Sequence, residues 1–177
     1  MKRSNNLVEI LRDIVVHKRV LIVCIGNRIR GDDGVGSYIG DKLVKANIGD
    51  VLNVESSLEN YLSRIANKKP EIILLIDAID AGLKPGAIII GSIEELKERV
   101  SFMTTHNIPI TLLMRFLKDV FQMRDVKVYL LGIQVKEVGI FEKISHEVKT
   151  SADYIVDLLK GLLILKAKRD CLRQNLT

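Results

Sequence analysis

Two apolar runs constrain most strongly what this chain can fold into. One is VLIVCI, from Val20 to Ile25, and the other lies within EIILLID, from Glu71 to Asp77. Neither run alternates apolar and polar residues, so neither fits a strand with one face in water. Both are much shorter than the roughly 18 apolar residues of a membrane span. They therefore predict two central strands of a sheet that is covered on both faces.

The rest of the chain alternates predicted strands with predicted helices. Further strands are expected at 51–55, 86–91 and 126–133, and helices at 5–17, 34–46, 58–66, 108–120 and 145–165. This order is typical of an α/β domain with a mostly parallel sheet between two helical layers, a three-layer α-β-α sandwich. The link from Asp77 to Ala87 is too short for the crossover that parallel neighbours need. The strand at 86–91 is therefore expected to run antiparallel, at an edge.

The length of 177 residues fits one domain at 1–177, with an additional N-terminal helix within 1–19 and a basic tail at 166–177. The net charge of +5 lies largely at the two ends of the chain, and no tryptophan or nucleic-acid motif accompanies it. A solvated surface explains this charge better than a nucleic-acid partner does.

The chain shows no sign of export. Glu9 and Asp13 interrupt the N-terminal segment, which leaves no signal-peptide core. Cys24 and Cys171 form neither a metal-ligand spacing nor a disulfide framework. We expect a cytoplasmic monomer without membrane insertion.

Acidic residues follow both apolar runs. Asp32 and Asp33 come after the first run, and Asp77 and Asp80 end or follow the second. Ligands collect at the carboxyl ends of strands in an open parallel sheet, so this position favours a site. Simpler roles exist: one of the first pair can cap the next helix, and Asp80 can be a turn residue. Asp77 is harder to explain in this way, because burial without a partner would cost several kcal/mol.

His106 is the histidine best placed to join these acids. It lies in TTHNIPI, before a predicted helix, whereas His17 and His146 are expected at the surface. A capping or packing role for His106 is as compatible with the pattern as a functional one. Two carboxylates and one imidazole on three loops at one sheet edge can form a divalent-metal site with open positions.

Glycines surround the first pair of aspartates without forming a phosphate loop. The stretch contains neither G-x-G-x-x-G nor the Walker pattern with its lysine. Aspartates in this position would also repel a pyrophosphate. Nucleotide binding is therefore disfavoured, and the glycines are expected to allow close backbone approach.

Four stretches, in this order, resemble the endopeptidases that mature nickel–iron hydrogenases. They are GNRIRGDDGVG (26–36), LIDAIDAGLKPG (75–86), TTHNIPI (104–110) and LLGIQ (130–134). The second and third are similar to the branch that processes the hydrogenase of formate-hydrogenlyase complexes. The resemblance implies a three-layer sandwich around a twisted five-stranded sheet. It also implies removal of a C-terminal extension from the hydrogenase large-subunit precursor after nickel insertion.

The resemblance further implies which residues form the site. By motif position, Asp33, Asp77 and His106 correspond to the metal-binding residues of the family, and Asp32 to a turn or capping residue. Nickel is then carried by the substrate and sensed by the site, and other divalent ions can occupy it in vitro. Asp33 or Asp77 is the candidate general base.

One position departs from the family pattern. Asn53 stands where many relatives carry an acidic residue, and Glu55 is the remaining candidate for that role.

Two alternatives remain open. One is a Rossmann-like, metal-dependent hydrolase of a small molecule, and the other a non-enzymatic chaperone that loads nickel. The sequence contains no G-x-S-x-G elbow, H-E-x-x-H helix or Ser–His–Asp order that would specify another protease class.

Overall fold

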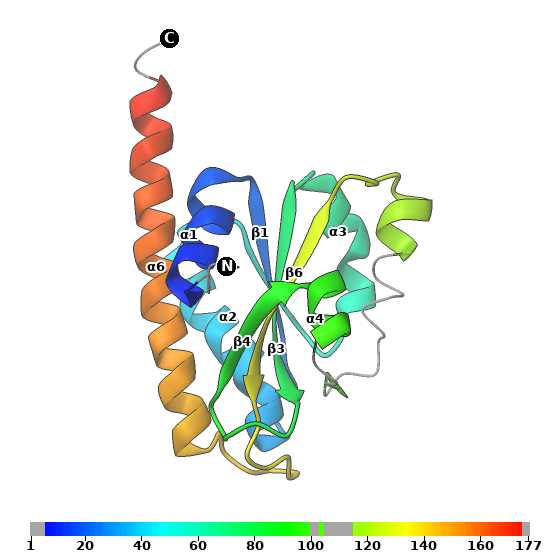
Figure 1. Cartoon of the computed structure of the whole chain (residues 1–177), viewed down its shortest axis with the longest axis vertical. Coiled ribbons are helices and arrows are strands. Elements are labelled where there is room, and N and C mark those ends of the chain that lie inside the picture. The colour runs from blue at the N-terminus through cyan, green and yellow to red at the C-terminus, as the bar shows by residue number, and fades with distance from the viewer. Residues whose placement is uncertain (1–5, 100–102, 105–114, 175–177) are drawn as a thin grey trace.

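The computed structural model describes residues 6–99, 103–104 and 115–174 (Figure 1). Its strands are β1 (Val20–Ile25), β2 (Val51–Glu55), β3 (Ile72–Asp80), β4 (Ile88–Ser92), β5 (Met103–Thr104) and β6 (Lys127–Gln134). Its helices are α1 (Leu7–His17), α2 (Val35–Ala46), α3 (Leu62–Asn67), α4 (Ile93–Arg99) and α6 (His146–Gln174). Single helical turns occur at η1 (Gly31–Gly34), η2 (Leu58–Tyr61) and η3 (Phe116–Val120).

The sheet confirms the predicted mixed topology. Its strand order is β2-β1-β3-β6-β4, and the short β5 pairs separately with β3. The pairs β1–β2, β1–β3 and β3–β6 are parallel. β4 is the edge strand and runs antiparallel to β6, as the short link after β3 predicts.

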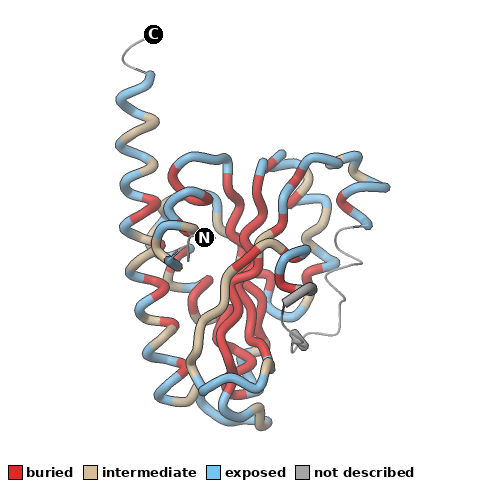
Figure 2. Tube along the Cα trace, in the orientation of Figure 1, coloured by how far each residue is buried: buried red, intermediate tan, exposed pale blue. Residues whose placement is uncertain are grey.

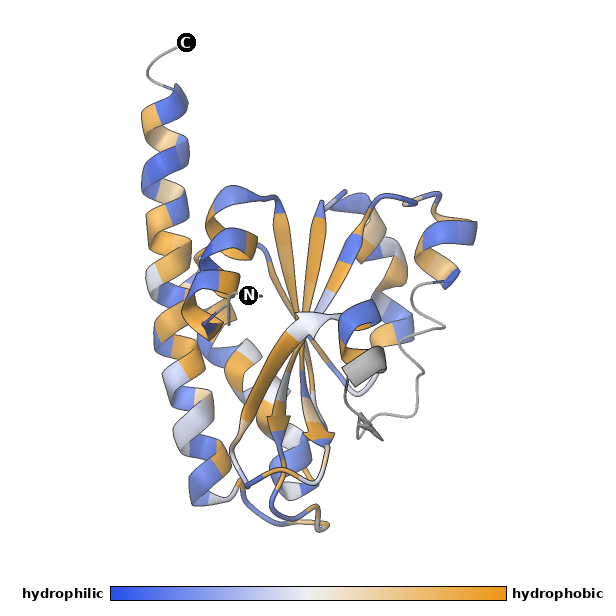
Figure 3. Cartoon of the chain, in the orientation of Figure 1, coloured by the Kyte–Doolittle hydropathy of each residue, from blue (hydrophilic) through white to orange (hydrophobic). Residues whose placement is uncertain are grey.

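Helices cover both faces of the sheet, which confirms the three layers (Figure 1). α1, α2 and α6 pack on one face, where Ile22, Leu74 and Leu131 point into one core cluster. α3 and α4 lie on the other face, where the alternate residues Val23 and Leu75 point into a second cluster. Figure 2 shows the central strands buried along most of their length, and Figure 3 shows that they are hydrophobic. The continuous apolar runs exist because each face has its own core.

Several predicted boundaries are wrong. β3 continues three residues past Asp77 to Asp80, because its end still pairs with β6 and β5. α4 was not predicted at all. The predicted helix at 108–120 lies mainly outside the described residues, and its described end is the π-helical turn η3.

The last helix is much longer than expected. α6 was predicted to end at Leu165, but it continues to Gln174, so most of the basic tail is helical. Its buried residues pack on the sheet, and α1 packs against it as well. The N-terminal helix α1 therefore packs within the molecule. None of the described helices combines the length and hydropathy needed to cross a bilayer.

Candidate functional site

The first turn of α2 lies directly against the end of β1 and the middle of β3. A Cβ atom on Gly36 would be 1.9 Å from the carbonyl oxygen of Ile25 and 2.6 Å from that of Ile76. Only glycine permits this approach of helix to sheet. Because Ile76 directly precedes Asp77, the contact brings the start of α2 to the strand that carries this aspartate.

Asp33 and Asp77 are both buried at this carboxyl edge. Their exposed fractions are 1% and 2%, and η1, which carries Asp33, packs against β3. The backbone C=O of Asp33 accepts a hydrogen bond from Asn27 at 3.0 Å, and Oδ1 of Asp77 accepts one from the N–H of Ala78 at 2.8 Å. Two buried carboxylates at one sheet edge are groups able to bind a cation or transfer a proton.

The third predicted site residue, His106, lies outside the described residues. Within the part of the chain that the structure describes, no three His, Cys, Asp or Glu residues are grouped closely enough to hold a metal ion. A joint metal site of Asp33, Asp77 and His106 therefore stays a prediction.

Asp32 does not cap a helix, in contrast to one of the roles expected for it. It is fully buried, and the N-cap position of α2 is Gly34, without a side-chain hydrogen bond. The Asp32 carboxylate instead accepts from the N–H groups of Lys136 (2.8 Å), Glu137 (3.2 Å) and Ser145 (2.7 Å), and from the Ser145 hydroxyl (3.0 Å). It thus ties the turn that carries Asp33 to both ends of the loop after β6.

Gln134 organises the turn after β3, a role that the sequence reasoning missed. Its Oε1 accepts from the N–H groups of Ala81 (2.8 Å) and Leu83 (3.2 Å). Its Nε2 donates to Oδ1 of Asp80 at 3.2 Å, and the same oxygen accepts from the N–H of Gly82 at 3.3 Å. Asp80 was predicted to be a turn residue, but it is the last residue of β3, and only its side chain binds the turn that follows. The available signal was a glutamine directly after the apolar run that ends at Ile133.

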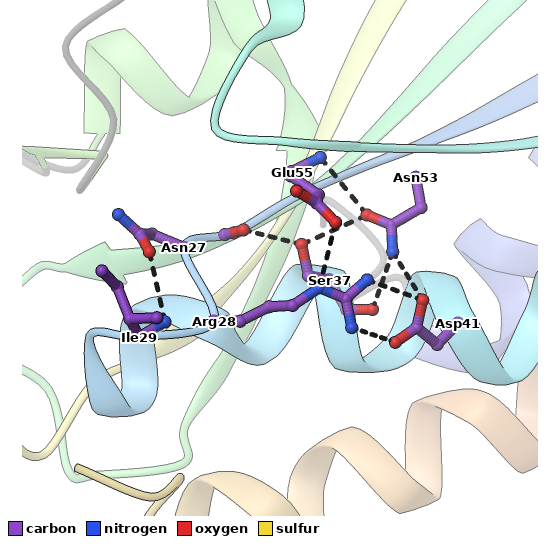
Figure 4. A network of polar contacts seen from close by, with 8 residues as sticks. Asn27, Arg28, Ile29, Ser37, Asp41, Asn53 and Glu55 are labelled. Carbon is purple, nitrogen blue, oxygen red and sulfur yellow. Dashed lines mark hydrogen bonds and ion pairs between the residues drawn. The ribbon is translucent and has the colours of Figure 1, made fainter. Parts of the chain in front are cut away.

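A polar network borders the site on the side of β2 (Figure 4). The Arg28 guanidinium donates to both carboxylate oxygens of Asp41 and, at 3.1 Å, to Oε1 of Glu55. These partners raise the pKa of Arg28, and the hydrogen bond from Arg28 is the main cause that lowers the pKa of Asp41. The sequence pattern did not indicate that Arg28 and Asp41 would form an ion pair, because their pairing depends on how α2 packs.

Asn53 belongs to the same network and holds β2 to α2. Its Nδ2 donates to Oδ1 of Asp41 at 2.9 Å and to the carbonyl oxygen of Ser37 at 3.1 Å. Its Oδ1 accepts from the Ser37 hydroxyl at 3.2 Å. Glu55 is exposed and paired with Arg28. Asn53 and Glu55 thus have structural partners in this chain.

Comparisons with known proteins all point to one family. A family model described as hydrogenase maturation protease matches residues 43–161. The hydrogenase 3 maturation protease of Escherichia coli (strain K12) is 33% identical over 144 residues, which cover 80% of this chain and 88% of that protein. The crystal structure of a NiFe hydrogenase maturation protease from Thermococcus kodakarensis KOD1 is 31% identical, with a TM-score of 0.74, and the match covers 87% of this chain and 98% of that one. A second NiFe hydrogenase maturation protease from Thermococcus kodakarensis is 28% identical, with a TM-score of 0.71 and coverage of 82% and 99%.

Proposed function

Because the chain belongs to the hydrogenase maturation protease family, we propose that it removes the C-terminal extension of a nickel–iron hydrogenase large-subunit precursor after nickel insertion. The observation that carries this proposal is the pair of buried carboxylates, Asp33 and Asp77, at the carboxyl edge of the sheet. The family explains why a chain would keep two aspartates there.

In this proposal nickel belongs to the substrate. Asp33, Asp77 and His106 recognise the metal that the precursor already holds, so only a loaded precursor completes the contact. Selectivity of this kind requires that the enzyme bind the loaded state more tightly than the empty one. Carboxylate and imidazole groups are suitable ligands for a divalent transition metal.

Peptide hydrolysis needs a base and a site for the oxyanion. Asp33 or Asp77 takes a proton from a water molecule, whose oxygen attacks the scissile carbonyl. The tetrahedral intermediate then collapses, the C–N bond breaks, and the proton passes to the leaving amine.

The test uses purified precursor with and without nickel. The full chain is mixed with each form, and the mass of the precursor is followed with time. We expect loss of a C-terminal peptide from the loaded form only, and loss of this cleavage in Asp33→Asn, Asp77→Asn and His106→Ala. Asp157→Asn, on the exposed face of α6, is the control and should cleave normally.

Other outcomes would contradict the proposal. Precursor that is bound but never shortened would match a nickel-loading chaperone. Cleavage that continues in all three site variants would remove these residues from the chemistry.

A further inference from the structure

Two loops carry exposed apolar residues on either side of β3. The loop after β1 presents Ile29, which is 55% exposed, and the loop after β6 presents Ile140 and Phe141, which are 70% and 85% exposed. The N–H of Phe141 donates to the carbonyl oxygen of Ile29 at 2.7 Å, so the two loops meet. We call Ile29, Ile140 and Phe141 the apolar tip.

The apolar tip adjoins the candidate site. β1 and β6 are the two neighbours of β3, the strand that carries Asp77. Ile29 also lies in the same loop as Asp33, four residues earlier. In Figure 1 the loop after β6 lies at the lower end of the sheet, opposite the end to which the C-terminus of α6 extends. A molecule that contacts the apolar tip is therefore beside the two buried carboxylates.

The conformation of the apolar tip is fixed by contacts below it. Asp32 binds the backbone at Lys136, Glu137 and Ser145, which are the two ends of the loop after β6. Phe141 has a φ of +64°, a left-handed conformation that residues other than glycine rarely adopt. Strained backbone is often found at ligand-binding sites, and exposed apolar side chains that lie together are typical of interaction surfaces.

We propose that the apolar tip is the docking surface for an apolar segment of the hydrogenase precursor polypeptide, an inference that rests on the proposed function. A metal ion or a small anion gains nothing from three aliphatic and aromatic side chains. A polypeptide substrate does, because it must be held while one peptide bond is cut. The position of the tip beside Asp33 fits a contact made during cleavage.

The test replaces the two most exposed residues of the tip. The double variant Ile140→Ser, Phe141→Asn makes the surface polar, and asparagine tolerates a positive φ, so the variant keeps the loop conformation. We expect KM for the nickel-loaded precursor to rise at least about tenfold with kcat little changed, since one large apolar contact is worth a factor of that order. The control is Leu172→Ser, an equally exposed apolar position (66%) on the distant end of α6.

Each result separates the docking surface from the proposed function. If the unaltered chain cleaves the loaded precursor and the double variant does so with unchanged KM, the docking surface is wrong and the function stands. A fall in kcat without a rise in KM would also contradict the proposed docking surface. If the unaltered chain cleaves no precursor, both proposals fail. A chain that elutes as a dimer, and as a monomer when the tip is altered, would identify the tip as a contact between copies instead.

Discussion

The carboxylate of Asp32 accepts a hydrogen bond at 2.7 Å from the backbone N–H of Ser145, 113 residues further along the chain. Ser145 directly precedes α6, and Asp32 directly precedes Asp33. The contact therefore joins the start of the last helix to the turn that holds one of the candidate catalytic groups. In Figure 1 the loop after β6 and the start of α6 lie together at the lower end of the sheet.

Replacing Asp32 by asparagine should destabilise the fold by about 2–3 kcal/mol. The buried carboxylate accepts from three backbone N–H groups and one hydroxyl, whereas an amide would place its own N–H groups against these donors. Urea unfolding followed by circular dichroism measures the change. Asp157→Asn, an exposed acid on α6, should stay within about 0.5 kcal/mol of the unaltered chain. Equal effects of the two changes would show that the hydrogen bonds of Asp32 do not stabilise the fold more than an exposed carboxylate does.

The sequence predicts the sheet well because its signals are local. The apolar runs of β1 and β3 mark strands buried on both faces, and the short link after Asp77 specifies the antiparallel edge strand β4. α4 was missed because its residues, IEELKER, carry few of the apolar positions that mark a helical face. The extension of α6 beyond Leu165 was missed for a similar reason, because the last turns of the helix leave the core and lose the apolar periodicity.

The site was predicted less completely because its contacts are long-range. Burial of Asp33 and Asp77 follows from their position after apolar runs. The partners of Asp32 are 104 to 113 residues away, and no pattern near Asp32 indicates them. Arg28 and Asp41 are closer in the sequence, but they meet only because the loop after β1 lies against α2.

Gly36→Ala should cost about 3 kcal/mol or more, or prevent folding. The added Cβ would lie 1.9 Å from the carbonyl oxygen of Ile25, which is backbone and cannot move aside without breaking the sheet. Gly161→Ala is the matched control, because apart from its chain neighbours and the adjacent backbone of its own helix, nothing lies within 4 Å of a Cβ at this position. The control should stabilise the chain by about 1 kcal/mol through helix propensity. Thermal unfolding of both variants checks the pair, and a mild effect at Gly36 would refute the close packing of α2 on the sheet.

Asn53→Asp should destabilise this chain by about 1–2 kcal/mol. An aspartate cannot donate to Asp41 or to the carbonyl oxygen of Ser37, and it places a second negative charge beside Asp41. Adding Asp41→Asn should recover part of the loss, because the amide then becomes the donor. A double-mutant cycle by urea unfolding measures this coupling. Additive effects would mean that the two side chains do not interact.

Asp153 should make stability depend on pH in the acid range. Its carboxylate accepts from the Tyr38 hydroxyl at 2.6 Å and from the Lys149 ammonium at 2.9 Å, and these two hydrogen bonds, the one from Tyr38 first, lower the pKa of Asp153 to about 2. A depressed pKa in the folded chain means that the ionised form stabilises folding. The contribution is therefore complete above the unfolded pKa of about 3.8 and is lost as the pH falls toward 2.

The size of this effect is limited by solvent. The Asp153 side chain is 41% exposed, so solvent screens its interactions. They contribute at most about 1 kcal/mol to the free energy of unfolding. Asp153→Asn should lower the free energy of unfolding by that amount at neutral pH, and the difference from the unaltered chain should shrink between about pH 4 and pH 2. Urea unfolding across this range measures the difference. Asp157→Asn, on the same helix, is the control and should stay within about 0.5 kcal/mol of the unaltered chain at neutral pH. If the gap for Asp153 stayed constant down to pH 2, its hydrogen bonds to Tyr38 and Lys149 would not be the source of the stabilisation, because protonation would then have removed nothing.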